Sequence, residues 1–192
     1  MVLTIDIGNT TIGIGGFQGN KLLFIEKISS RRPLSDAGYI EKLNMILNKH
    51  GLSAEAFEGS MISSVVPSVT AVFSSALETF LGRKPLILSH KLDLGYEICT
   101  EFPEKVGCDR LADIAGALSR YSLPFVTIDL GTATTFNVLD ENRRFLGGLI
   151  LPGVGTAHRA LLGKTAQLPK GDIHMPAHTI GANTQECITG GM

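Results

Sequence analysis

The chain has 192 residues, of which 44% are hydrophobic and 18% charged, a composition that favours a folded globular protein over a disordered one. Lysine and arginine number 17 against 18 acidic residues, and this net charge of -1 argues against nucleic acid or an acidic membrane as the main partner. The start of the sequence has no basic segment and reaches an acid at Asp6, so we expect no signal peptide. No apolar run approaches the roughly 20 residues that cross a bilayer, and three cysteines at unrelated spacings indicate neither a disulfide framework nor a zinc site. These features predict a soluble cytoplasmic protein.

The predicted elements alternate between short apolar strands and helices with apolar residues at helical spacing. Three antiparallel strands come first, and the Gly19-Asn20 pair between the second and third is a hairpin signal. Ser35 and Gly51 delimit the first helix, and Gly82 ends the second. In chain order, the predicted strands are 2–7, 11–17, 22–28, 60–66, 86–89, 125–129, 134–139 and 145–150. Helices are expected over 35–51, 69–80, 109–121, 155–162 and from Asn183 onward, and an irregular connection over 92–103.

A short motif occurs twice, each time at the end of an apolar strand that opens a three-stranded meander. The first copy is Asp6-Ile7-Gly8-Asn9-Thr10-Thr11, and the second is Asp129-Leu130-Gly131-Thr132-Ala133-Thr134. A repeat of this length indicates two duplicated halves that face one another across a cleft. The alternative is that each motif is an ordinary turn in which the aspartate accepts backbone hydrogen bonds.

The residue types in each copy suit a polyphosphate and its metal ion. The carboxylate of Asp6 suits a hydrated divalent cation, and Gly8 lets a phosphate approach the backbone without an intervening Cβ. Backbone and side-chain groups of Asn9, Thr10 and Thr11 offer donors to phosphate oxygens. Two such loops would hold a triphosphate tail and Mg²⁺ between them. The second copy offers the same set of groups through Asp129, Gly131, Thr132 and Thr134.

Asp109 directly precedes a predicted helix, within Gly107-Cys108-Asp109-Arg110, and two roles are open for it. As a helix N-cap its carboxylate would accept a backbone hydrogen bond, and spacing alone favours this role. Alternatively, it accepts a proton from a substrate hydroxyl while Arg110 fixes an anionic group of that substrate. For Cys108 we expect a small filling side chain and not a reactive thiolate.

Six ordered motifs run along the whole chain. They are Asp6-Ile7-Gly8-Asn9-Thr10, Ser63-Ser64-Val65-Val66-Pro67, Gly107-x-Asp109-Arg110, Asp129-x-Gly131-Thr132-Ala133-Thr134-Thr135, Gly147-Gly148 with Pro152-Gly153, and Ile180-Gly181-x-Asn183-Thr184. Together they resemble the type III pantothenate kinases of the acetate kinase, sugar kinase, Hsc70 and actin superfamily. The resemblance implies an α/β fold with duplicated ribonuclease H-like (actin-like ATPase) βββαβα halves around a cleft. Residues 1–115 would form the first half and residues 116–192 the second, which is expected to be incomplete and truncated relative to the family.

The same resemblance implies ATP-dependent phosphorylation of pantothenate to 4'-phosphopantothenate, the first step of coenzyme A biosynthesis. It implies a first ATP-phosphate loop made of Asp6, Ile7, Gly8, Asn9, Thr10, Thr11, Ile12 and Gly13, and a second that contains Thr132. Asp109 would be the general base, and the pantothenate contacts would be Gly107, Cys108, Asp109 and Arg110. Asp129 would bind a monovalent cation, K⁺ or NH₄⁺, so that the expected cofactors are ATP, Mg²⁺ and this cation. Thr184 would contact the substrate bound to the neighbouring subunit of a homodimer.

Two departures from the family pattern leave alternatives open. Thr100 stands where the family usually has a tyrosine of the pantothenate pocket, and Tyr96 is a candidate substitute. The chain ends at Met192, whereas family chains continue with further strands and a glycine-rich segment. The alternatives are a kinase of another small hydroxy acid and a non-catalytic accessory or regulatory protein of the same fold. A net charge of -1 and the lack of a helix-turn-helix pattern weigh against direct contact with DNA.

Overall fold

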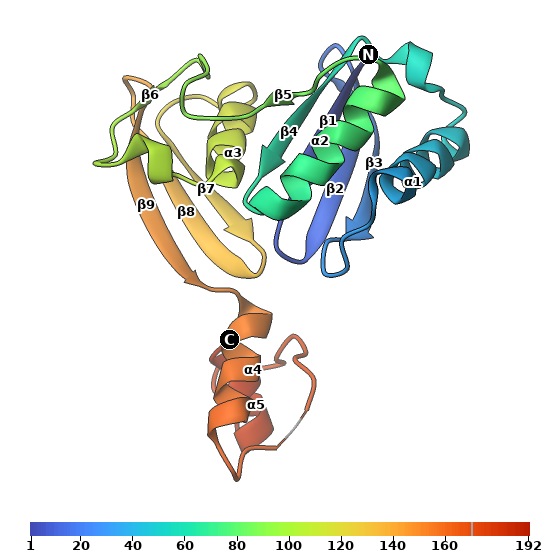
Figure 1. Ribbon diagram of the computed structural model, residues 1–192. Coiled ribbons are helices and arrows are strands. Elements are labelled where there is room, and N and C mark those ends of the chain that lie inside the picture. Colours follow the sequence, from blue (N-terminus) through green and yellow to red (C-terminus); the bar gives the residue numbers. More distant parts are fainter. Residues whose placement is uncertain (170) are drawn as a thin grey trace.

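Figure 1 shows the computed structural model, which describes residues 1–169 and 171–192. Two β-sheets stand side by side, and one helix, α3 (Cys108–Leu118), lies between them. A pair of helices covers the first sheet, and the last two helices lie beyond the end of the second sheet, which α4 touches at β8 (Figure 1).

The first sheet has five strands in the order β3-β2-β1-β4-β5. β1 to β3 form the predicted antiparallel meander, and β4 joins β1 in parallel, so that Asp6 lies beside Ser63. Alternate residues of β1 face opposite sides of the sheet, and Leu3, Ile5 and Ile7 are buried on the side away from Asp6. The strands are β1 (Val2–Ile7), β2 (Thr11–Gln18), β3 (Lys21–Ser29), β4 (Gly59–Ser64) and β5 (Leu86–Ile87).

Helices α1 (Asp36–Lys49) and α2 (Pro67–Leu81) cover the apolar face of the first sheet, as the helical spacing predicts. α1 begins after Ser35, whose hydroxyl accepts a backbone hydrogen bond from the first turn at 3.3 Å. α2 begins at Pro67, because a proline lacks only an N–H that the first helical position leaves unpaired. It ends at Gly82, whose φ of 67° favours glycine.

The main hydrophobic core lies between these helices and the first sheet. Tyr39 of α1 and Phe73 of α2 are fully buried there, with ring centroids 4.5 Å apart. They pack against the aliphatic side chains of β1 and β2, which fixes the strand ends that carry Asp6 and the following loop. A short 3₁₀ helix, η1 (Ala54–Ala56), connects α1 to β4.

The second sheet has four strands in the order β6-β9-β8-β7. β7, β8 and β9 form a second antiparallel meander, as the sequence predicts, and α3 packs on one face of β7 and β8. A small core of Ile114, Leu139 and Phe145 lies beneath α3, which also contacts β4 of the first sheet. The strands are β6 (Glu97–Ile98), β7 (Phe125–Leu130), β8 (Ala133–Leu139) and β9 (Arg144–Pro152), and a 3₁₀ helix, η2 (Pro103–Lys105), precedes α3.

Residues 92–103, which we expected to be irregular, contain the two-residue strand β6. Glu97 and Ile98 pair in parallel with Arg144 and Phe145 at the edge of β9. Two residues are too few to produce an alternating pattern, so the strand depends on a partner that lies more than forty residues away. The prediction of a wholly irregular segment was therefore wrong.

Within the described ranges, fewer helices and strands cover the second sheet than the first. β7 forms its edge, whereas the corresponding β1 has a partner on both sides. The face of the second sheet that points away from α3 is exposed and apolar, and it includes Val126, Ile128, Leu130, Leu149 and Leu151. The equivalent face of the first sheet is covered by α1 and α2.

The last two helices lie close to their predicted positions. α4 (Val154–Lys164) follows β9, and α5 (Thr184–Gly190) begins after Asn183, whose side chain accepts a hydrogen bond from Glu186 N at 3.0 Å. Across residues 1–169 and 171–192, no helix combines the length and the apolar character needed to cross a membrane.

Candidate functional site

The two aspartates of the repeated motif occupy corresponding places in the two sheets. Asp6 lies near the end of β1 opposite Gly13 of β2, and Asp129 lies near the end of β7 opposite Thr135 of β8. A tight turn follows each of them, closed by a hydrogen bond from a glycine. Gly8 N donates to Thr11 O at 3.0 Å, and Gly131 N donates to Ala133 O at 2.9 Å. The two turns therefore share a glycine donor, although the second turn is one residue shorter than the first.

The two turns touch one another. Thr10 Oγ1 and Thr132 Oγ1 lie 3.1 Å apart, although 122 positions separate them in the sequence. The carbonyl oxygen of Thr132 also accepts hydrogen bonds from Gly153 N at 3.0 Å and from Thr156 Oγ1 at 2.8 Å. The N-terminus of α4, with its unpaired N–H groups, thus adjoins the second turn, where it favours a negatively charged group.

Not every residue of the first predicted phosphate loop has a side chain available to a ligand. Ile7 is 1% exposed and Ile12 is fully buried, so both point into the main core and offer only backbone atoms. Asn9 is exposed in the turn. A Cβ at Gly13 would make only an ordinary contact with the Cβ of Asp6, 3.8 Å away, so glycine is not required there for space.

Asp109 is not the N-cap of α3, so the interpretation favoured by spacing was wrong. Gly107 occupies the N-cap position, and Asp109 is the second residue of the helix. Its Oδ1 accepts a hydrogen bond from Arg110 N at 2.8 Å, and no other donor among the described residues bonds to this carboxylate. A Cβ at Gly107 would overlap Asp109 Oδ1, so glycine there leaves room for the carboxylate in this orientation.

The carboxylates of Asp6, Asp109 and Asp129 converge, and Asp113, one turn after Asp109 on α3, joins them. Burial raises the pKa of Asp6, and the charges of Asp109 and Asp129 raise it further, against the lowering effects of the Ser63 hydroxyl and Lys27. Burial and the same three aspartates raise the pKa of Asp113 to about 7. A cleft with this much like charge favours cationic ligands.

Arg110 turns from α3 toward the second sheet. Its Nε donates to Asn137 Oδ1 at 2.5 Å, and its Nη2 donates to Phe136 O at 3.4 Å. The guanidinium carbon lies 5.4 Å from the ring centroid of Phe145. Burial lowers the pKa of Arg110, and the carboxylates of Asp109 and Asp113 oppose that shift, so the group keeps its positive charge.

Cys108 and Tyr96 serve the packing of α3. Cys108 Sγ lies 3.1 Å from Leu88 O, and burial raises the pKa of its thiol, which favours the filling role over the thiolate. Tyr96 donates its hydroxyl to Leu111 O at 2.9 Å and packs its ring against the second core. Thr100 lies separately, beside Gly147 in β9. Tyr96 thus does not occupy the position of Thr100.

Thr184 is not brought to the other predicted site residues. It is the first residue of α5, and Figure 1 shows α5 well apart from α3 and from the turns after β1 and β7. A role for Thr184 at this cleft therefore requires a second chain or a different placement of α5.

Two residues of this region were missed in the sequence. Asp113 is four positions after Asp109, and this helical spacing could have placed both on one face of α3. Asn137 is fully buried in β8, yet nothing around it in the sequence distinguishes it from the exposed asparagines. Its contact with Arg110 depends on how α3 packs against the sheet.

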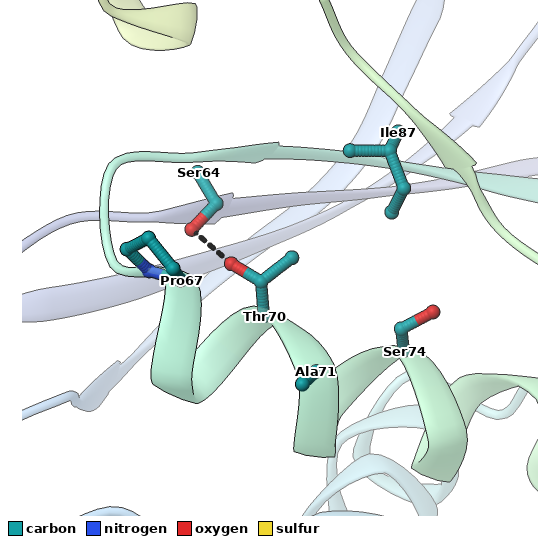
Figure 2. A pocket seen from close by; sticks show the side chains of 6 residues that line it. All are labelled: Ser64, Pro67, Thr70, Ala71, Ser74 and Ile87. Carbon is teal, nitrogen blue, oxygen red and sulfur yellow. Dashed lines mark hydrogen bonds between the residues drawn. The ribbon is translucent and has the colours of Figure 1, made fainter.

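A separate hollow of about 450 Å³ lies on the other side of β4, between α2 and β5 (Figure 2). Thr70 donates its hydroxyl to Ser64 Oγ at 2.6 Å on its wall. None of the predicted site residues lines this hollow, whose surface is formed by Ser64, Pro67, Thr70, Ala71, Ser74 and Ile87.

Comparison with known proteins identifies the family to which these turns and this helix belong. Residues 2–192 match the family model described as type III pantothenate kinase. The chain belongs to the type III pantothenate kinase family. Over its whole length it is 38% identical to the type III pantothenate kinase of Bifidobacterium animalis subsp. lactis, of which it covers 76%. It is 36% identical to that of Dictyoglomus turgidum, of which it covers 75%. By its family the protein is a kinase.

Solved structures confirm the predicted fold class. A Campylobacter jejuni protein described as a Baf family transcriptional activator matches 98% of this chain and 72% of its own, with a TM-score of 0.56 and 17% identity. A Porphyromonas gingivalis protein described as an N-acetylglucosamine kinase matches 89% of this chain and 59% of its own, with a TM-score of 0.50 and 18% identity. At these identities the likeness concerns the fold alone, a mixed α/β fold with two sheets.

Proposed function

We propose that this type III pantothenate kinase family member transfers the γ-phosphoryl group of ATP to the hydroxyl of pantothenate and forms 4'-phosphopantothenate, the first step of coenzyme A biosynthesis. The observation that supports it most is the convergence of Asp6, Asp109 and Asp129 at the point where the two turns meet. Phosphoryl transfer needs groups that hold the phosphates, a cation that neutralises charge and a group that orients the attacking hydroxyl, and this arrangement offers a candidate for each.

ATP binds with its phosphates between the two turns. The first turn, within the stretch from Asp6 to Gly13, donates backbone N–H groups and the hydroxyl of Thr10. The second donates the hydroxyl of Thr132, and the adjoining N-terminus of α4 favours the phosphate charge. A phosphate oxygen accepts both threonine hydroxyls once it replaces their mutual contact.

The oxygen groups of the cleft fit the cations that the family implies. Asp6 suits Mg²⁺, and Asp129 suits a monovalent cation, K⁺ or NH₄⁺. Beside Asp129, Thr135 Oγ1 is buried and has no hydrogen-bond partner among the described residues, so one oxygen donor is available there. In residues 1–169 and 171–192, no cluster of three or more His, Cys, Asp or Glu side chains is arranged to hold a metal ion by itself. This suits Mg²⁺ bound largely through water and phosphate. When bound, Mg²⁺ neutralises charge on the transferring phosphoryl group.

Asp109 acts as the general base. Its Oδ1 is engaged by Arg110 N, which leaves Oδ2 to accept the proton of the pantothenate hydroxyl as the oxygen attacks phosphorus. The bond from this oxygen to the γ-phosphorus forms while the bond to the β,γ-bridging oxygen breaks, and ADP leaves. Gly107, Cys108 and Arg110 form the wall against which pantothenate lies, and Arg110 pairs with its carboxylate.

The remaining proposals concern the whole molecule. Residues 1–115 and 116–192 are proposed as the two halves of the enzyme, with β6 and α3 packing on the second sheet. We propose a homodimer in which Thr184 reaches the substrate of the partner, because α5 lies away from the cleft of its own chain (Figure 1). The protein is proposed to work in the cytoplasm.

The test is a coupled ADP-release assay with ATP, Mg²⁺, K⁺ and pantothenate. Asp109→Asn should lower kcat by about 10²- to 10⁴-fold, because a positioned base contributes that much, with an unchanged circular dichroism spectrum. Asp36→Asn, at the start of α1, is the matched control and should retain wild-type kcat. Wild-type turnover by Asp109→Asn would refute the role of Asp109 as general base. Turnover of other hydroxy acids but not of pantothenate would favour the related kinase, and no turnover of any acid would favour a regulatory protein.

A further inference from the structure

Asn137 is a fully buried polar side chain in the middle of β8, and both ends of its amide are engaged. Its Oδ1 accepts the hydrogen bond from Arg110 Nε at 2.5 Å. Its Nδ2 donates to Thr127 Oγ1 at 3.0 Å. A buried amide with a partner for each end is stable in one orientation, whereas an unpaired end would carry a desolvation cost.

The pairing register explains why these three residues meet. Thr127 of β7 lies directly opposite Asn137 of β8, so both side chains project from the same face of the sheet. α3 packs on that face and brings Arg110 to the free end of the amide. If the amide were reversed, its NH₂ group would face Arg110 Nε–H, donor against donor. Because Arg110 Nε can only donate, it keeps Oδ1 of Asn137 directed at itself, and Thr127 Oγ1 accepts from Nδ2 and anchors the other end of the amide.

The contact with Asn137 determines where the rest of the guanidinium lies. The group is planar and has five N–H donors, so fixing Nε fixes the directions of all the others. Asn137 takes one donor and Phe136 O takes a second, at a longer 3.4 Å. Among the described residues, no acceptor pairs with the remaining three. They are available to an oxyanion.

Gly148 of β9 keeps the space that this arrangement needs. A Cβ there would lie 3.1 Å from Arg110 Nη2 and would overlap Phe136 O. A larger residue would therefore displace both the guanidinium and its second acceptor. The position of Arg110 is thus set by Asn137 on one side and by Gly148 on another.

We propose that Asn137 is a positioning residue that aims the free N–H edge of Arg110 at the carboxylate of the acceptor acid, and so sets the enzyme's affinity for that acid. The proposal rests on the proposed function, in which Arg110 binds the substrate. A neutral acceptor suits this task, because it orients the guanidinium without cancelling the charge that attracts the substrate. An aspartate in its place would still accept from Nε but would compete for the positive charge.

The experiment measures KM and kcat for pantothenate and KM for ATP in the full chain with wild type, Asn137→Leu, Asn137→Asp and Thr127→Val. Asn137→Leu keeps the branching and the number of heavy atoms of the side chain and removes the acceptor, so KM for pantothenate should rise about 10- to 100-fold, the range of a charge-assisted hydrogen bond. Asn137→Asp should restore most of this affinity and raise KM only about threefold. Thr127→Val should raise KM about fivefold, since the amide loses the bond that orients it.

Asn142→Leu, an exposed position in the same β8–β9 hairpin, is the matched control and should match wild type. Circular dichroism and thermal unfolding verify that each variant is folded, and kcat and KM for ATP should change by less than about threefold. If Asn137→Leu does not fold, the KM for pantothenate of the folded Thr127→Val variant serves as the test.

The outcomes separate this proposal from the proposed function. A wild-type chain that does not phosphorylate pantothenate overturns both. An active wild type with an unchanged pantothenate KM in folded Asn137→Leu or Thr127→Val overturns the positioning role alone. A rise confined to KM for ATP shows that Arg110 serves a phosphate, which overturns the carboxylate assignment. Equal losses in Asn137→Leu and Asn137→Asp indicate a structural role and also overturn it.

Discussion

Asp113 should make the folded protein less stable at neutral and alkaline pH than it would be with an asparagine at that position. Its carboxyl group is partly desolvated and faces three other aspartates, which raises its pKa from 3.8 to about 7. In the unfolded chain the group ionises freely near its ordinary pKa. Between these two pKa values the folded state holds a proton that the unfolded state has released, so stability falls as pH rises through this window.

The size of the effect follows from the pKa difference. A change from 3.8 to about 7 would cost about 4 kcal/mol if it were fully felt. Because solvent reaches part of the side chain and screens the neighbouring charges, we expect Asp113→Asn to stabilise the protein by about 1–2 kcal/mol at pH 8. At pH 4.5 the gain should be less than about a third of that, since Asp113 is then largely protonated in the folded state.

Urea unfolding followed by circular dichroism at pH 4.5, 6, 7 and 8 measures the effect as a difference in the free energy of unfolding. Glu41→Gln, an exposed carboxylate on α1, is the control and should show no such trend with pH. A stability gain for Asp113→Asn that is the same at every pH, or a loss at pH 8, would refute the idea that like charge at the cleft strains the fold.

Two further substitutions test the packing. Gly148→Ala should destabilise the protein by about 2–4 kcal/mol in urea unfolding, because the new Cβ overlaps Phe136 O. Gly116 is exposed in α3 and has nothing near the position of a Cβ, so the matched change Gly116→Ala should stabilise the protein by about 0.5–1 kcal/mol. Similar changes in the free energy of unfolding for Gly148→Ala and Gly116→Ala would contradict the overlap at Gly148. Tyr39→Phe should be neutral or raise the melting temperature, because the buried Tyr39 hydroxyl has no partner among the described residues. A decrease of more than about 1 kcal/mol in the free energy of unfolding of Tyr39→Phe would mean that the Tyr39 hydroxyl makes a hydrogen bond.

The meanders and most helices were predictable because local signals determine them. Alternation marks β1, and Ser35 and Gly82 mark helix ends through capping chemistry that acts over a few residues. β6 was not predictable, because two residues become a strand only when β9 is already beside them. The N-cap of α3 was misassigned by two residues, since Gly107 occupies the cap and Asp109 bonds to its own neighbour.

Some features of the candidate site were likewise predictable from local sequence, and others were not. Asp6 and Asp129 were predictable because duplication repeats their surroundings in the sequence. The meeting of Thr10 and Thr132 was expected in outline, since two halves facing a cleft bring such turns together. Asn137 was not predictable, because its role depends on the face of β8 that α3 covers and not on its sequence neighbours.

In the proposed mode of ATP binding, the contact between Thr10 and Thr132 must break before a phosphate enters between the turns. Among the described residues, it is one exposed hydroxyl pair that joins the two turns, at 3.1 Å. Breaking such a bond costs about 1 kcal/mol, which lowers the apparent affinity for a triphosphate by a factor of about five. A phosphate entering there would offer both hydroxyls a charged acceptor in exchange for that bond, so the two threonines would bind one phosphate oxygen from both halves at once.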